Sequence, residues 1–269
     1  MTPNFPRANK ALGQHFLNDQ KVIEDICSNF SNTANSIIEI GPGPGVLTNK
    51  LSQLELPYIL IEKDKRFIES LSEWVSPNQI YFEDALKINI AEIIKGNAWE
   101  DKMIWLVSNL PYNVGVPIFL KFMQVEQIKY MTLMFQKEVG EKIVSHSKKI
   151  KMNSLMALSQ NYFDVKTVCK VPPSAFTPPP KVDSIVISLT RKENAVIPLS
   201  QFYEFEKFLR KIYIFKRKQL GTIVKGQFPN VKLKAIHEIL KNLDVDPSVR
   251  AETFDLQTLQ MLFEKIEKL

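Results

Sequence analysis

The chain has 269 residues, which suits one large or two modest domains, and its 45% of apolar and 24% of charged residues are typical of a globular protein. Its net charge of +6 hints at a polyanionic partner. No apolar run approaches the roughly 18 residues of a membrane-spanning helix, and the N-terminal segment lacks the apolar stretch of a secretory signal. Two cysteines and three scattered histidines form neither a disulfide framework nor a metal-ligand pattern, so we expect a reduced, cytoplasmic, metal-free monomer.

Short β-rich runs alternate with helical runs up to about residue 190. Such alternation predicts an α/β fold with a seven-stranded, mostly parallel sheet, covered on both faces and binding ligands at the carboxyl ends of its strands. The last two predicted strands have no helix between them, which favours an antiparallel pair. The predicted strands are 36–40, 58–62, 80–83, 105–109, 130–135, 165–171 and 184–190, and the predicted helices are 46–54, 65–74 and 117–125.

A buried strand runs into a glycine-rich turn, with glycines at Gly41, Gly43 and Gly45, and then into a helix. Glycine lets the backbone turn tightly and approach a ligand closely. The spacing differs from the G-x-G-x-x-G of a dinucleotide fold. Glu62, at the end of the second strand, is placed to accept hydrogen bonds from two ribose hydroxyls. This pair favours an adenosine-containing ligand but does not separate a nicotinamide enzyme from a methyltransferase; a glycine turn without a ligand is the alternative.

Two further strand ends carry polar residues. Asp84 follows the third strand, where it either accepts a hydrogen bond from an adenine amine or caps the following helix. Asn109, Leu110, Pro111 and Tyr112 follow the fourth strand. In isolation this tetrapeptide is typical of a simple proline turn. Its position after a strand of the same sheet places it at the ligand end.

Short motifs follow one another along nearly the whole chain. They are G-Q-H-F-L at 13–17, E-I-G-P-G-P-G-V-L-T at 39–48, I-E-K-D at 61–64, D-A at 84–85, N-L-P-Y-N at 109–113, Q-K-E-V at 136–139, F-T-P-P-P-K-V at 176–182 and F-K-R-K-Q-L at 215–220. In this order the sequence resembles the dimethyladenosine transferases that modify small-subunit ribosomal RNA, whose close relatives are antibiotic-resistance adenine methyltransferases of large-subunit RNA. One departure is Lys151-Met152, where relatives often carry Tyr-Gly before a helix that here starts around Asn153.

The resemblance implies a Rossmann-like class I methyltransferase that uses S-adenosylmethionine to dimethylate N6 of two adjacent adenosines in small-subunit ribosomal RNA during ribosome biogenesis. It implies a cofactor pocket lined by His15, Leu17, Gly41, Gly43, Glu62, Asp84 and Asn109. The segment Gly13–Leu17 can alternatively do no more than lead into a helix and pack on the core.

The residues of the N-L-P-Y loop suit chemistry on an adenine amine, whose lone pair is delocalised into the ring. The Asn109 side-chain oxygen and the Leu110 carbonyl are placed to accept its two N–H groups, and Pro111 fixes the turn. Tyr112 is expected to stack on the base, and Phe176 to cover the opposite face. Alternatively, Tyr112 packs on the sheet edge and Phe176 is a hydrophobic plug in a polyproline-like linker.

After residue 192 the pattern becomes helical, with predicted helices at 201–213, 231–243 and 256–269. We therefore predict a methyltransferase domain at 1–192 and a helical RNA-binding domain at 193–269. Nine Lys or Arg and no Asp or Glu lie between Lys207 and Lys234. Basic side chains among aromatics favour RNA, although a charge run is often only a solvated helix face. The predicted RNA contacts are Arg210, Lys211, Lys216, Arg217 and Lys218.

Three other functions stay open at this point. A large-subunit methyltransferase conferring macrolide resistance is disfavoured by Pro117, the F-T-P-P-P-K-V loop and the full helical C-terminal region. A non-catalytic RNA-binding assembly or transcription factor is disfavoured by the intact Glu62, Asp84, Asn109 and Tyr112. The glycine spacing and the N-L-P-Y loop disfavour a nicotinamide oxidoreductase.

Overall fold

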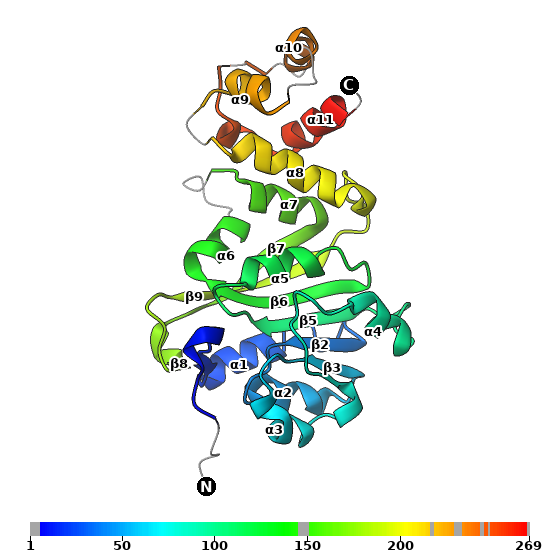
Figure 1. Ribbon diagram of the computed structural model, residues 1–269, viewed down its shortest axis with the longest axis vertical. Coiled ribbons are helices and arrows are strands. Elements are labelled where there is room, and N and C mark those ends of the chain that lie inside the picture. The colour runs from blue at the N-terminus through cyan, green and yellow to red at the C-terminus, as the bar shows by residue number, and fades with distance from the viewer. Residues whose placement is uncertain are drawn as a thin grey trace. The chain divides into compact units, whose positions relative to one another are not determined.

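The structure is a computed structural model that describes residues 6–144, 151–215, 218–228, 233–242, 245–246 and 248–267 (Figure 1). The chain divides into two compact units, one of Met1–Gly140 with Val165–Arg191 and one of Glu141–Asp164 with Lys192–Leu269. The second unit thus includes Glu141–Asp164, which the predicted boundary near residue 192 assigns to the first domain. The physical reason is that this segment contains the helix Ser154–Tyr162, which packs against the C-terminal helices.

The first unit is built around a seven-stranded sheet with the strand order β4-β3-β2-β5-β6-β9-β7. Pairs from β4 to β6 are parallel, and β9 is antiparallel to β6. The predicted mostly parallel α/β fold is confirmed. The two last strands of the prediction, β7 and β9, are neighbours. The strands are β2 (Ser36–Ile40), β3 (Tyr58–Ile61), β4 (Ile80–Tyr81), β5 (Ile104–Asn109), β6 (Ile128–Gln136), β7 (Phe163–Val171) and β9 (Ser184–Arg191).

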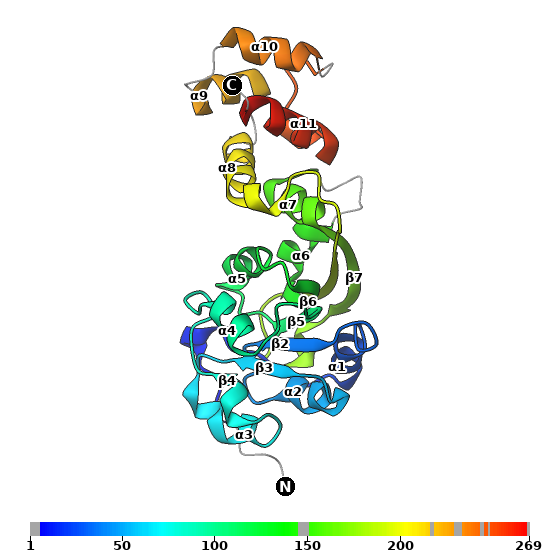
Figure 2. The same cartoon turned by 90° about the vertical axis from the view of Figure 1, so that its right-hand side faces the viewer.

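Helices cover both faces of this sheet (Figures 1 and 2), which explains why β2 and β3 are buried at every residue. On one face lie α1 (Gln20–Cys27), α2 (Val46–Leu51) and α3 (Ile68–Ser72), and on the other lie α4 (Ile90–Gly96) and α5 (Gly115–Phe122). Short 3₁₀ turns at Ser52–Leu54 and Lys65–Phe67 complete two of the predicted helices. Other such turns are Lys10–Leu12, Pro77–Gln79, Pro173–Ala175, Leu199–Gln201 and Ala251–Thr253.

A second, two-stranded antiparallel sheet joins parts of the chain that are distant in sequence. In it β1 (Phe16–Leu17) pairs with β8 (Phe176–Thr177), with Leu17 opposite Phe176. The Asn18 amide also donates to the Ala175 carbonyl at 2.9 Å. The N-terminal segment is thereby attached to the loop that precedes β9.

The second unit is helical. Its helices are α7 (Ser154–Tyr162), α8 (Phe202–Tyr213), α9 (Leu220–Gln227), α10 (Leu233–Asn242) and α11 (Leu256–Glu267), and α6 (Lys137–Val144) leads into it. The three predicted C-terminal helices are confirmed wherever the structure describes them. The Phe263 ring packs on Phe205 and Phe208, with centroids 5.1 and 5.4 Å away. The Asn153 side chain caps α7 by accepting from the Met156 amide at 3.0 Å. None of the described helices is long and apolar enough to cross a membrane.

Candidate active site

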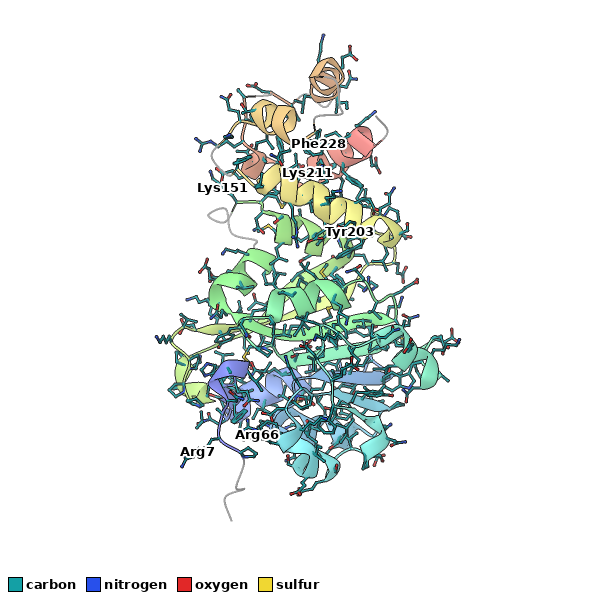
Figure 3. The ribbon with its side chains drawn as sticks, viewed as in Figure 1. Arg7, Arg66, Lys151, Tyr203, Lys211 and Phe228 are labelled. Carbon is teal, nitrogen blue, oxygen red and sulfur yellow. The ribbon has the colours of Figure 1, made fainter. Side chains whose placement is uncertain are left out.

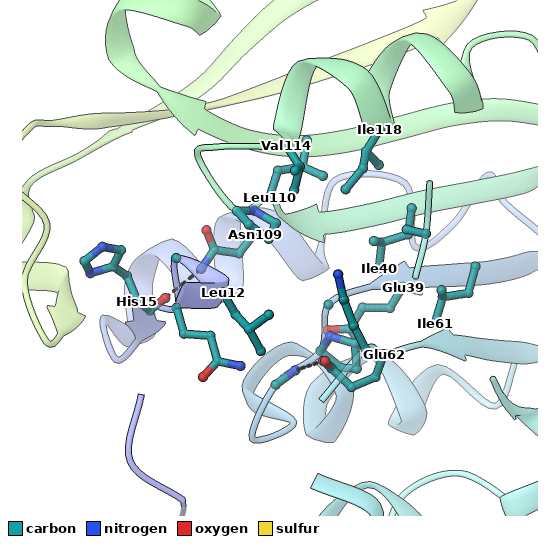
Figure 4. A pocket seen from close by; sticks show the side chains of 18 of the residues that line it. Leu12, His15, Glu39, Ile40, Ile61, Glu62, Asn109, Leu110, Val114 and Ile118 are labelled. Atoms are coloured by element: carbon teal, nitrogen blue, oxygen red, sulfur yellow. Dashed lines mark hydrogen bonds between the residues drawn. The ribbon is translucent and has the colours of Figure 1, made fainter. Parts of the chain in front are cut away.

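A cavity lies at the carboxyl ends of the parallel strands β2, β3, β4 and β5 (Figure 4). This is where open α/β sheets bind ligands, since the loops that follow parallel strands meet at one edge. The predicted site residues that line it come from the N-terminal segment and from four strand ends. They are His15, Leu17, Gly41, Gly43, Glu62, Asp84, Asn109, Leu110, Pro111 and Tyr112.

The glycine turn forms one wall of the cavity, which its first two glycines line. All three glycines of the turn adopt a left-handed backbone, with φ +65° at Gly41, +55° at Gly43 and +85° at Gly45, a region that residues with a Cβ rarely adopt. A Cβ on Gly43 would lie 3.4 Å from the Phe16 ring, an ordinary van der Waals contact. The backbone conformation, and not a lack of space, therefore favours glycine at position 43.

Glu62 presents a buried carboxylate to the cavity. Its Oε2 accepts from the Gly43 amide at 2.9 Å and its Oε1 accepts from the Asp64 amide at 2.7 Å. Burial raises the pKa of Glu62, and the backbone donors partly oppose this shift. Each oxygen carries a second lone pair, so the carboxylate retains acceptor capacity for ligand hydroxyls.

Asp84 lies at the cavity wall and caps the turn after β4, whereas the following helix α4 is capped by Asn89, so the alternative of a helix cap is wrong. Its Oδ1 accepts from the Leu86 amide at 2.9 Å, which caps the turn after β4. Its Oδ2 accepts from the Lys63 ammonium at 2.9 Å. The hydrogen bond from Lys63 is the main reason that the pKa of Asp84 lies below its ordinary value. The side chain is an ionised acceptor at the cavity wall as well as a cap.

Asn109, the last residue of β5, is oriented by the N-terminal segment. Its Nδ2 donates to the His15 carbonyl at 3.1 Å (Figure 4). Because Nδ2 is bonded to His15, the Oδ1 of Asn109 is the side-chain atom that can accept a hydrogen bond from a ligand in the cavity. Leu110 is buried, and its amide donates to the Met134 carbonyl at 3.3 Å, which anchors the loop to β6.

Phe176 lies elsewhere. The side chain is 3% exposed, belongs to the main hydrophobic core and does not line the cavity. Pairing of β8 with β1 holds it opposite Leu17. The predicted role as a cover over the base is therefore not supported by this position, and the alternative of a hydrophobic plug describes it better.

Glu39, which the sequence analysis did not single out, also lines the cavity. It is 1% exposed and accepts hydrogen bonds from the Thr48 hydroxyl, at 2.8 Å, and from the Tyr58 hydroxyl. Burial raises its pKa to about 7, although both hydroxyls favour the ionised form. The available signal was a carboxylate inside an otherwise apolar strand that leads into the glycine turn.

A second unpredicted network attaches the N-terminal segment to the loop after β3. Asp64 accepts from Arg66 Nη2 at 2.6 Å and from Gln14 Nε2 at 2.9 Å, and Arg66 Nη1 donates to the Arg7 carbonyl at 3.1 Å. Arg7 and Arg66 are labelled in Figure 3. Arg66 lowers the pKa of Asp64 to about 2. The cavity wall at His15–Leu17 is thus connected to the Glu62 loop.

The predicted RNA-binding cations lie in the second unit. Arg210 Nη2 pairs with Glu206 at 2.5 Å. The Lys211 ammonium lies 4.7 Å from the centre of the Phe228 ring (Figure 3), and that of Lys218 lies 4.3 Å from the Phe215 ring. Lys216 and Arg217 lie outside the described residues. Over the described part of the chain, no group of three or more His, Cys, Asp or Glu side chains could hold a metal ion.

Known proteins are similar to this chain in sequence and in fold. Residues 6–260 match the family described as ribosomal RNA adenine dimethylase. A Staphylococcus aureus (strain JH9) protein named ribosomal RNA small subunit methyltransferase A is 33% identical over 266 residues, which cover 96% of this chain and 90% of the relative.

Solved structures agree with this match. A dimethyladenosine transferase from Plasmodium falciparum superposes with a TM-score of 0.76 at 26% identity, covering 94% of this chain and 98% of that one. The 23S rRNA methyltransferase ErmE shares the fold, with a TM-score of 0.67 at 20% identity, covering 94% of this chain and 99% of that one. The predicted methyltransferase fold is confirmed, and the chain belongs to the ribosomal RNA adenine dimethylase family.

Proposed function

We propose that this protein transfers methyl groups from S-adenosylmethionine to N6 of two adjacent adenosines in small-subunit ribosomal RNA, in the cytoplasm, during ribosome biogenesis. The observation that carries the proposal is the N-L-P-Y loop at the cavity, where the Asn109 amide nitrogen is already bonded to His15 and Oδ1 is left as an acceptor. Membership of the adenine dimethylase family and the name of the Staphylococcus aureus relative support the same substrate.

The cavity suits S-adenosylmethionine, which supplies an electrophilic methyl group on a sulfonium. The acceptor capacity left on the buried Glu62 carboxylate matches the two hydroxyls of a ribose. The ionised Asp84 carboxylate suits the amine of an adenine. The left-handed glycines that line the cavity leave room for the rest of the ligand beside the backbone. His15 and Leu17 close the cavity from the N-terminal side.

The loop after β5 acts on the target amine. The Asn109 Oδ1 and the Leu110 carbonyl accept its two N–H groups, which draws the nitrogen toward a tetrahedral geometry and directs its lone pair at the methyl carbon. Pro111 keeps the turn rigid and adds no competing donor. Bound S-adenosylmethionine would supply the methyl group and keep the electron pair of the broken carbon–sulfur bond, and the methylated amine would then be acidic enough to lose its extra proton to solvent. Catalysis then depends on alignment and electrostatic fit, with no strong general base.

The second unit is proposed to bind the RNA. Phosphate contacts from Arg210, Lys211, Lys216, Arg217 and Lys218 would position the substrate without reading its sequence. Lys211 and Lys218 lie over aromatic rings, and we expect both ammonium groups to attract phosphates from there.

The test combines calorimetry with product analysis. We expect the protein to bind S-adenosylmethionine and, with unmethylated small ribosomal subunits, to yield N6-dimethyladenosine after RNA digestion. Cofactor binding with no methylated adenosine in the digest would contradict the proposed activity. Calorimetry with NADH in place of S-adenosylmethionine, at an about 30-fold higher concentration, should show no binding heat. That excess would reveal an affinity weaker by about 2 kcal/mol.

A further inference from the structure

Tyr112 is restrained at two points of its side chain. Its hydroxyl lies 2.6 Å from the Ser184 hydroxyl. Its ring stacks on the His15 ring, with centroids 5.6 Å apart and an angle of 26° between the planes. Tyr112 itself is half-buried and lines the cavity. The residue expected to stack on the target base is therefore held both at its polar end and on one face.

The sheet topology explains why Ser184 reaches Tyr112. Ser184 is the first residue of β9 and pairs opposite Gln136, the last residue of β6. Strand β6 is parallel to β5, in which Asn109 lies opposite Met134. The antiparallel β9 thus begins at the edge where β5 ends and the N-L-P-Y loop starts. Ser184 is 0% exposed, and a buried hydroxyl requires a hydrogen-bond partner, which here is Tyr112.

His15 is itself held by the loop before β9. Its Nδ1 donates to the Pro178 carbonyl at 2.8 Å. The His15 carbonyl accepts from Asn109, so His15 contacts both Asn109 and Tyr112 of the N-L-P-Y loop. With one face of Tyr112 against His15, a base that stacks on this ring would take the opposite face.

We propose that Ser184 is a positioning residue of the target-base site, which fixes the Tyr112 ring by holding its hydroxyl while His15 supports one face. The inference rests on the proposed function. Stacking depends on the orientation of the ring plane. When the Tyr112 ring is held in place beforehand, base binding does not incur the entropy cost of ordering it. Ser184 touches no reacting atom and acts only through Tyr112.

A double-mutant cycle tests this with the full chain. Ser184→Ala removes the partner and Tyr112→Phe removes the hydroxyl while keeping the ring. We expect each change to lower kcat/KM for unmethylated small subunits by about fivefold, and the double variant to be no worse than either single one. Affinity for S-adenosylmethionine should stay within about twofold, because the Tyr112 and Ser184 hydroxyls contact each other and hydrogen-bond neither Glu62 nor Asp84.

Ser188→Ala, a serine-to-alanine change on the same strand at a buried position, is the matched control and should retain wild-type kcat/KM. Wild-type kcat/KM in Tyr112→Phe or in Ser184→Ala would overturn the inference. The inference would also be overturned if the losses in kcat/KM of the two single variants multiplied in the double variant, or if weaker cofactor binding accounted for the loss in kcat/KM. A wild-type protein inactive on small subunits overturns the proposed function together with the inference, whereas an active wild type with multiplying effects overturns the inference alone.

Discussion

The cavity of the first unit and the basic segment of the second use charge in different ways. In the cavity, charged groups are buried, hydrogen-bonded and shifted in pKa, as Glu39 and Glu62 are. In the second unit, the described cations of the proposed RNA surface make local contacts, such as Arg210 with Glu206 across one helical turn. Perturbed pKa values cluster where a protein does chemistry, whereas binding to a phosphate backbone depends on summed charge.

Substitutions in the two regions should differ in their effects. No neighbour can replace the hydrogen bonds of a cavity side chain, so its loss should have a large effect on either cofactor binding or methyl transfer. A surface cation is one of several, so its loss should have a smaller effect that depends on salt. The four predictions below test that difference, from the largest expected effect to the smallest.

Replacing Asn109 with alanine should have the largest effect. Loss of a preoriented polar group at a reacting centre costs about 100-fold to 1,000-fold in kcat in comparable sites. Single-turnover methyl transfer, with cofactor binding followed by calorimetry, measures the two properties separately. An Asn109→Ala protein that binds cofactor normally and retains near-wild-type turnover would contradict the acceptor role.

Glu39 should make stability depend on pH. Its pKa rises from 4.5 to about 7 in the folded state. Between these values the folded protein holds a proton that the unfolded chain has lost, so the free energy of unfolding falls as pH rises, by about 3 kcal/mol in total. Urea unfolding from pH 4.5 to 8 should show this slope in the wild type and lose it in Glu39→Gln. Parallel curves for the two proteins would show that Glu39 does not titrate in this range.

Glu62→Gln should weaken S-adenosylmethionine binding by about 30-fold, or ~2 kcal/mol, because one charged acceptor becomes a donor that faces backbone N–H groups. Calorimetry measures the change directly. Glu92→Gln, an exposed site on α4, is the control and should bind as the wild type does. Equal affinity in all three proteins would remove Glu62 from the cofactor site.

Reversing charge at Arg217 and Lys218 should have the smallest effect, about a tenfold loss of RNA affinity at low salt with cofactor binding intact. The slope of log affinity against log salt should become shallower. Lys265→Glu, an exposed site on α11, controls for charge alone. An unchanged salt dependence in the Arg217→Glu/Lys218→Glu protein would count against this segment as a phosphate-binding surface.

The sequence predicted the part of the site that depends on strand ends. Glu62 and Asp84 come after strands and Asn109 ends one, and the carboxyl ends of parallel strands meet at one edge, so their convergence at the cavity could be foreseen. The C-terminal helices could be predicted equally well, because the spacing of apolar residues along the sequence shows which face of an amphipathic helix is buried.

Contacts between distant segments could not be predicted. The two-residue strands β1 and β8 have no periodicity of their own, and Phe176 is buried in a core that distant segments of the chain form together. Glu39 was missed because its donors, Thr48 and Tyr58, come from a helix and from a neighbouring strand. Such residues are determined by tertiary packing, which local patterns do not record.

Methylation of adenosine in small-subunit ribosomal RNA at this cavity is tested most directly by transfer of labelled methyl groups from S-adenosylmethionine to unmethylated small subunits and, in parallel, to large-subunit RNA. We predict label on the small subunit alone, recovered as dimethyladenosine and abolished by Asn109→Ala. Label confined to large-subunit RNA, or label on small subunits that survives Asn109→Ala undiminished, would contradict this activity.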